Sequence, residues 1–169
     1  MEGVTALFAR DHGELVASFA PEYAEILRDL VGETSQLLKH PVDRRDPGLA
    51  RLFPDAYQQQ SDSAEFRRLT ESELKAGKLA AAERLLSTVP PGGGEVRLDE
   101  QDADAWLRAL NDARLLIGSR LELTDDTDIV SELNAEVDRD PTSPRVGQLA
   151  VYGLLTEIQN DLIEALTEG

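Results

Sequence analysis

Apolar residues recur every three or four positions over most of the 169-residue chain, which is the spacing of amphipathic helices. The clearest case follows Pro21, where an apolar stripe faces away from charged residues, and His40–Pro41 ends the pattern. The spacing predicts helices over 21–39, 62–70, 71–89, 99–121 and 125–137, a helical turn at 49–53, and a last helix after Pro144 whose apolar stripe runs from Val151 to Leu166.

The first segment departs from this spacing. Two short β-rich runs, 4–8 and 14–19, flank a turn at His12–Gly13 and predict a β-hairpin, with an N-terminal helix as the competing interpretation. A short extended piece is expected at 95–98. The chain is therefore predicted to be mainly α: a single domain over 1–169, with a bundle of about six helices at 21–167 and a small N-terminal β-hairpin at about 4–19.

A break is expected within the region 62–89. Thr70 to Glu73 has the T-x-x-E form of a capping box, in which a hydroxyl and a carboxylate satisfy the free N–H groups at a helix start. Two helices meeting at Thr70 superficially suggest a helix-turn-helix. The second of them carries acidic residues that balance its basic ones, which disfavours contact with DNA.

One charged residue lies where the core of the bundle is expected. Arg114 falls in the middle of the apolar face of the 99–121 helix. A buried guanidinium keeps its charge and needs a partner. The favoured interpretation is a structural ion pair of Arg114 with Glu65, with Asp55 as the second choice of partner. We therefore expect Arg114 to be largely buried, with a carboxylate within hydrogen-bonding distance.

Two other interpretations of Arg114 stay open. It is a candidate for the floor of an anion- or ligand-binding site, together with Lys78 or Arg120, because perturbed charges gather at functional sites. Lys78 lies on the apolar face of the 71–89 helix, yet its long stem can also reach solvent from there. The third interpretation is that the helix phase is misjudged, in which case Arg114 is exposed.

The charge of the chain restricts its partners. The net charge is −16, with 15 acidic and 11 basic residues in 1–85 against 18 and 6 in 86–169. Nucleic-acid binding needs clustered Lys and Arg, so no nucleic-acid partner is expected. The chain has no cysteine, which excludes thiolate catalysis and Cys-ligated zinc. It also lacks a signal peptide and any apolar run of about 18 residues, so we expect a cytoplasmic protein with no membrane partner.

Catalytic motifs are missing from the sequence. The chain contains no P-loop, no G-x-G-x-x-G and no G-x-S-x-G, and its two histidines, His12 and His40, lack the ligand spacing of a metal site. The acidic run 125–128 does not meet the glycine requirement of an EF-hand loop, so helix capping explains it better than calcium. No catalytic residue, metal or cofactor is predicted, and an enzyme is disfavoured.

Four segments together resemble the actinobacterial DUF2017 family, a domain of unknown function. They are LFPDAY (52–57), EFRRLTESELKAGKLAAAERLL (65–86), DADAWLRALNDARLLIGSRL (102–121) and YGLLTEIQNDLIEAL (152–166), and they occur in the family's order over most of the chain. The resemblance implies no established activity. Family genes commonly lie beside the gene for the ClpS adaptor of the Clp protease, and some members are described as transcriptional regulators.

These observations favour a non-enzymatic interaction or regulatory protein with a protein partner, linked by the family's gene context to Clp-dependent proteolysis. The first alternative is a small anionic-ligand-binding protein or enzyme that uses Arg114 and Lys78. The second alternative is a transcriptional regulator. A homodimer is compatible with the wide apolar stripe of the last helix, although burial of that stripe inside the domain is the default.

Overall fold

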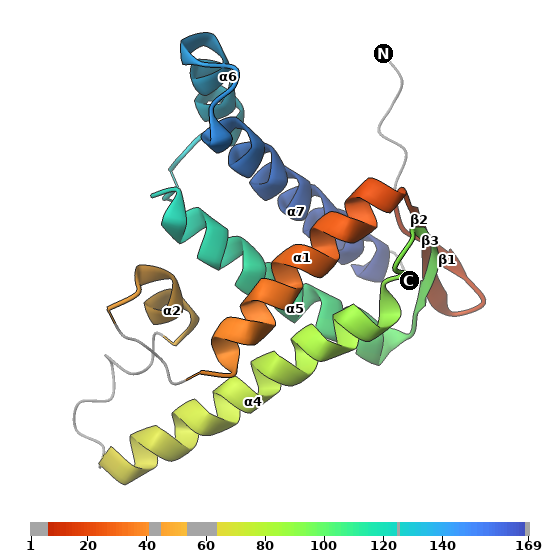
Figure 1. The fold of residues 1–169 in the computed structure, drawn as a ribbon. Helices are drawn as coiled ribbons and strands as arrows, with labels where there is room; N and C mark the ends of the chain where they lie inside the picture. Colours follow the sequence, from red (N-terminus) through yellow and green to blue (C-terminus); the bar gives the residue numbers. More distant parts are fainter. Residues whose placement is uncertain (1–6, 41–44, 54–63, 125, 168–169) are drawn as a thin grey trace.

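The computed structural model describes residues 7–40, 45–53, 64–124 and 126–167 and has a mainly α architecture (Figure 1). Within these residues the helices are α1 (Pro21–Leu38), α2 (Pro47–Leu52), α4 (Ala64–Thr88), α5 (Glu100–Arg120), α6 (Ile129–Arg139) and α7 (Pro144–Thr167). Helix α5 is the centre of the bundle, because α1, α2, α4 and α7 all pack against it, whereas α6 packs along α7. The predicted mainly helical fold is confirmed.

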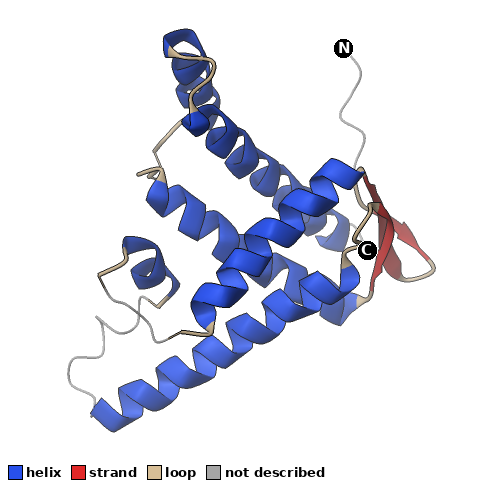
Figure 2. Ribbon diagram, viewed as in Figure 1, coloured by secondary structure: helices blue, strands red, loops and turns tan. Residues whose placement is uncertain are grey.

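A small antiparallel sheet covers one end of the bundle (Figure 2). Its strands are β1 (Ala9–Asp11), β2 (Glu14–Phe19) and β3 (Gly94–Leu98), in the order β1-β2-β3. The hairpin about the His12–Gly13 turn is confirmed, but its first strand is Ala9–Asp11 and not the predicted run 4–8, since Leu7 and Phe8 precede the strand. Both turn residues have positive φ, which suits glycine at the second position. The extended piece expected at 95–98 is the third strand, whereas residues 4–6 of the predicted first run lie outside the described residues.

The core joins the sheet to the centre of the bundle. Trp106 of α5 is fully buried, and its ring lies against Phe8 and Phe19 at centroid distances of 6.1 and 5.7 Å. Its indole Nε1 donates a hydrogen bond to Thr88 Oγ1 at 2.6 Å, which satisfies the one polar group of the ring. The sheet and the start of α5 are therefore held by one aromatic cluster.

The break expected at Thr70 is wrong. Helix α4 runs from Ala64 to Thr88 without interruption, so the described chain forms no helix-turn-helix at this position. The T-x-x-E pattern favours a helix start only where the chain leaves the helical conformation before it. Here the flanking residues are mostly Ala, Leu, Glu, Lys and Arg, which are strong helix formers and carry the helix through.

The acidic residues between the helices act as caps, as expected. The Asp99 carboxylate accepts a hydrogen bond from the backbone N–H of Asp102 at 2.7 Å, and α5 begins directly after it. The Asp128 carboxylate accepts from the N–H groups of Val130 and Ser131 at the start of α6. Hydrogen bonds from the backbone and hydroxyl of Ser131 lower the pKa of Asp128 below its ordinary value. No helix of the described chain carries a stretch that is both long and apolar enough to span a bilayer.

Candidate functional site

Three charged residues in the second half of α5 each contact a different neighbouring helix. Asp112 faces α4, Arg114 faces α7, and Arg120 faces α1. Asp112 and Arg114 are two positions apart, and Arg120 follows six positions after Arg114. With 3.6 residues per turn, these spacings direct the three side chains to different sides of the helix. The charges therefore tie the central helix to three of its neighbours.

The contact with α4 is a buried ion pair. Lys78 Nζ donates a hydrogen bond to Asp112 Oδ1 at 2.8 Å, and the two side chains are 18% and 3% exposed. Burial raises the pKa of Asp112 above its ordinary value, and the hydrogen bond and charge of Lys78 oppose that rise. Lys78 thus has a carboxylate partner that sequence reasoning missed. The available signal was the spacing of Asp112 from Ala109 and Leu116, which are both buried.

Arg114 is half-buried between α5 and α7. Its Nη1 donates a long hydrogen bond of 3.5 Å to Thr156 Oγ1, and its guanidinium lies 5.9 Å from the ring centroid of Tyr152. The Thr156 hydroxyl in turn donates to the carbonyl of Tyr152 at 3.0 Å. The Arg114 interaction is thus a cation–π contact with a hydroxyl beside it, and the Nε of Arg114 is buried without a hydrogen-bond partner.

The structure does not bring Arg114 and Glu65 together. Glu65 is exposed in the first turn of α4, and the helix that faces Arg114 is α7. The pairing was wrong because helical periodicity identifies which face of a helix is buried, but not which neighbour covers it. Asp55, the second choice, lies outside the described residues.

The candidate anion site is not assembled from its three predicted members. Lys78 contacts Asp112, Arg114 contacts α7, and Arg120 Nη1 donates to Glu33 Oε1 at 2.8 Å on the side of α1. Each cation therefore lies at a separate helix interface. Among the described residues, no group of three or more His, Cys, Asp or Glu side chains is placed to hold a metal ion.

Two clefts flank the central helix. The first lies between α4 and α5, has a volume of about 310 Å³, and mixes charges of both signs; its lining residues are Glu73, Leu74, Gly77, Lys78, Arg108, Asn111 and Asp112. The second, which we name the α1–α5–α7 groove, has a volume of about 360 Å³; it is lined by Leu30, Glu33, Ile117, Arg120, Leu121, Pro144, Gly147, Gln148 and Val151. The groove has an apolar lining with few charges, which suits binding of apolar side chains.

A smaller hollow continues the groove along α1 and α5. It shares Leu30 and Ile117 with the groove and extends to Leu37 and Leu116. The ion pair of Glu33 and Arg120 belongs to the lining of both hollows. Their side chains are 55% and 48% exposed, so this pair lies at the surface and crosses the boundary between the two hollows.

Helix α1 carries a row of exposed carboxylates, of which Glu33 lines the groove. We name Glu22, Glu25, Asp29 and Glu33 the acidic ridge; their spacing of three and four residues places them on one face of the helix. Beside the ridge, Tyr23 is 47% exposed, and Ile26, Leu30 and Leu37 are half-buried. Within the described structure, Glu33 is the one ridge residue that forms an ion pair.

The sequence pattern predicts one apolar stripe along α1. The structure buries Leu27, Val31 and Leu38 and leaves the stripe's other edge partly open to solvent. The signal was the width of the stripe, because one packing contact covers only part of a broad apolar face.

Comparisons with known proteins place the chain in a family. The profile of DUF2017, described as a domain of unknown function, matches residues 1–166. A protein of Mycobacterium tuberculosis (strain ATCC 25618 / H37Rv) named "Oxidative stress regulator AosR" is 34% identical over 148 aligned positions, covering 68% of this chain and 68% of its own length. A Mycobacterium leprae (strain TN) protein, named as a candidate regulator of the same kind, is 31% identical over 182 positions, covering 87% and 80%. No solved structure matches the chain. The match over nearly all of the sequence shows that the chain belongs to the DUF2017 family.

Proposed function

We propose that this chain is a regulatory protein that acts by binding another protein in the α1–α5–α7 groove. The observation that carries the proposal is the groove itself, which has an apolar lining and includes Glu33 of the acidic ridge. The relatives named as oxidative stress regulators support a regulatory role. The link to Clp-dependent proteolysis, which rests on gene context, stays a prediction that none of these observations bears on.

The groove is suited to a protein partner because binding there breaks only weak contacts within the chain. Its apolar side chains lose water on contact, which is the main favourable term in protein association. The ion pair of Glu33 and Arg120 is half exposed, and exposed pairs contribute only about 0–1 kcal/mol. Both partners of the pair are therefore free to exchange with charges of an incoming protein at small cost.

The small anionic-ligand alternative receives less support. Lys78 is neutralised by a buried carboxylate, and Arg114 faces a hydroxyl and an aromatic ring at another interface. An anion would have to break these contacts, and it could then bind only one of the two cations, because they lie at different helix interfaces. The groove requires no such rearrangement.

The chain offers no thiol for the direct detection of oxidants. Thiolate oxidation is the usual chemistry of protein redox sensors, and the chain has no cysteine and a single methionine, Met1. We therefore place this chain among the components that transmit a stress response by contact with a partner, with detection of the oxidant assigned to another protein.

Filling the groove is expected to abolish the regulatory effect. A Cβ at Gly147 of α7 would meet no other atom within 4 Å, so Gly147→Trp occupies the groove without disturbing the backbone. In cells that lack the gene, we expect the wild-type chain, but not Gly147→Trp, to restore the transcript response to peroxide.

The matched control is Gly77→Trp, because Gly77 is also an open helical glycine but lines the α4–α5 cleft. It should restore the response as the wild type does. Restoration by Gly147→Trp at wild-type protein levels would overturn the proposal, and loss in Gly77→Trp alone would move the functional site to the other cleft.

A further inference from the structure

We propose that the occupant of the α1–α5–α7 groove is a basic amphipathic helix of the partner protein. This inference rests on the proposed function and specifies the class of partner. Two features lie side by side on the same helix: the apolar edge formed by Tyr23, Ile26 and Leu30, and the acidic ridge next to it. A helix with an apolar stripe flanked by Lys or Arg presents the complementary pattern.

The acidic ridge is available to a partner because nearby cations point elsewhere. Arg28, the cation within the ridge segment of α1, donates to the carbonyls of Leu86 and Val89 at the end of α4. Glu22, Glu25 and Asp29 have no ion pair within the described structure, and Arg120 alone neutralises Glu33.

The cations beyond α1 also leave the ridge uncompensated. Among the residues lining the groove, Arg120 is the one basic side chain. Arg145, at the start of α7, donates to the Leu121 carbonyl and lies within 4.0 Å of carboxylates of Glu132 and Glu136 in α6. The ridge thus presents up to three unpaired carboxylates to a partner.

The dimensions of the ridge fit a helical partner. From Glu22 to Glu33 the ridge spans 12 residues of helix, and the 11 steps between its ends rise about 16.5 Å, or three turns, at 1.5 Å per residue. The two hollows along α5 meet the ridge segment at Leu30 and Glu33 and continue past it to Leu37, two turns from Leu30 on α1. A partner helix with apolar residues at i, i+3 or i+4, and i+7 matches this length.

Charge also argues against other occupants. A second copy of the chain brings another net charge of −16 to the acidic ridge, and anionic lipids and nucleic acids are repelled in the same way. A basic helix instead gains both apolar burial and attraction. Since electrostatic complementarity mainly accelerates association and selects partners, its contribution should be sensitive to salt.

The test uses three fluorescent 18-residue peptides and the purified chain. The first peptide has Leu at i, i+3, i+4 and i+7 positions with Lys and Arg flanking the apolar stripe. The second replaces these cations by Glu, and the third keeps the basic composition in scrambled order. Fluorescence anisotropy is measured at low and moderate salt. We expect the first peptide to bind at least about tenfold more tightly than the other two, a difference that salt reduces.

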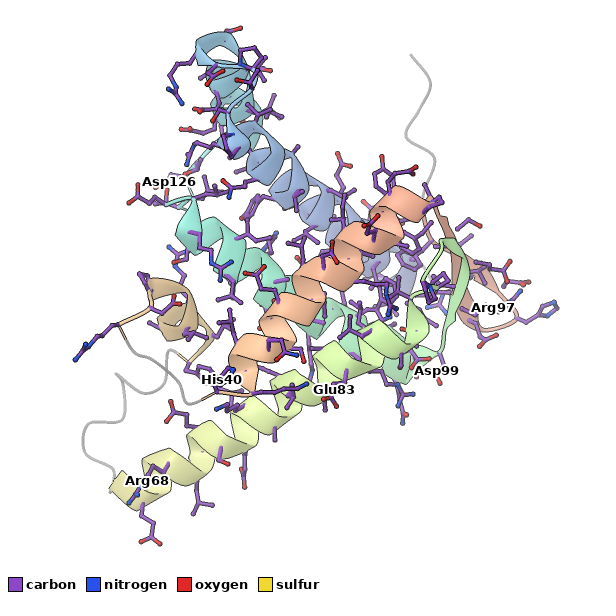
Figure 3. The ribbon with its side chains drawn as sticks, viewed as in Figure 1. His40, Arg68, Glu83, Arg97, Asp99 and Asp126 are labelled. Carbon is purple, nitrogen blue, oxygen red and sulfur yellow. The ribbon has the colours of Figure 1, made fainter. Side chains whose placement is uncertain are left out.

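Matched variants locate the binding site. Glu25→Lys/Asp29→Lys reverses two ridge charges, and Glu83→Lys/Glu164→Lys makes the same change in net charge at exposed positions of α4 and α7; Glu83 is labelled in Figure 3. We expect the ridge variant and Gly147→Trp to weaken binding of the first peptide about tenfold or more, and the control pair to weaken it less than threefold.

The outcomes separate this inference from the proposed function. If the scrambled basic peptide binds as tightly as the first peptide, the attraction depends on net charge alone and the basic-helix assignment is wrong. The same conclusion follows if both charge-reversed pairs weaken binding equally. Self-association of the chain in light scattering that Gly147→Trp abolishes would assign the groove to a second copy. If no peptide binds but Gly147→Trp still abolishes regulation in cells, the partner class is wrong and the regulatory groove stands.

Discussion

Replacing Lys78 by methionine is expected to lower the free energy of unfolding by about 3–5 kcal/mol at pH 7. The substitution keeps the apolar stem of the side chain but leaves the carboxylate of Asp112, which is 3% exposed, without its counter-charge. Asp112 Oδ2 already lacks a hydrogen-bond partner, so the charge of nearby Arg108 offsets only part of the loss. Urea unfolding followed by circular dichroism measures the change.

The effect should depend on pH in a defined direction. Burial already raises the pKa of Asp112, and removal of Lys78 raises it further. A carboxyl group with a raised folded-state pKa costs stability above that pKa, and the cost disappears as the pH falls through it, because the protonated group needs no counter-charge. The difference between wild type and Lys78→Met is therefore largest at neutral pH and shrinks toward pH 4.

The two partners of the pair should not be equivalent. Lys78 is 18% exposed, and its long stem lets the ammonium reach solvent when Asp112 is replaced by leucine. Asp112→Leu is therefore expected to cost less than Lys78→Met, and the double variant should recover most of the loss. Lys75→Met on the same helix, which removes an exposed contact with the His40 carbonyl, is the control and should cost less than about 1 kcal/mol. A loss for Lys78→Met that is as small as the control would show that the pair is not structural.

The second large effect is expected at Gly93, in the turn between α4 and β3. Its φ is +81°, and a Cβ at this position would lie 2.7 Å from the backbone N of Pro21 and 2.8 Å from the carbonyl oxygen of Phe19. Both atoms belong to backbone at the junction of β2 and α1, so neither can move aside cheaply. We expect Gly93→Ala to cost about 3 kcal/mol or more, measured by thermal and urea unfolding.

Substitutions at the two neighbouring glycines distinguish the cost of steric contact from the cost of backbone strain. Gly94 also has positive φ (+122°) but open space around its Cβ position, and Gly92 has neither constraint. Gly94→Ala should cost about 1–2 kcal/mol from backbone strain alone, and Gly92→Ala should be close to neutral. If all three substitutions cost the same, the close approach of this turn to the start of α1 is not a determinant of stability. Because α1 forms one wall of the groove, a displaced turn would also alter the binding surface.

Much of the fold could be predicted because periodicity and capping are local. The helix after Pro21, the caps at Asp99 and Asp128, and the hairpin at His12–Gly13 depend on residues within a few positions of one another. The prediction at Thr70 failed for the same reason: a local capping pattern was present, and the continuous run of helix formers in α4 outweighed it.

The candidate site was less predictable because its contacts join distant parts of the chain. Lys78 and Asp112 are 34 residues apart, and Arg114 and Thr156 are 42 residues apart. Periodicity identified Lys78 and Arg114 as unusual charges on apolar faces, but their partners depend on how the helices cross. The groove requires three helices to be placed at once, so no single segment of the sequence predicts it.

The most direct test of the groove as the partner-binding surface is site-specific crosslinking in the native cell. A photoreactive amino acid is introduced at Gln148, which is exposed and lines the groove, and at Glu83 of α4 as a control. Mass spectrometry of the crosslinked peptides identifies the contacted segment. We predict that Gln148, and not Glu83, crosslinks during oxidative stress to a segment with the pattern of a basic amphipathic helix. Crosslinks of the same partner at Glu83 alone, with none at Gln148, would contradict the account.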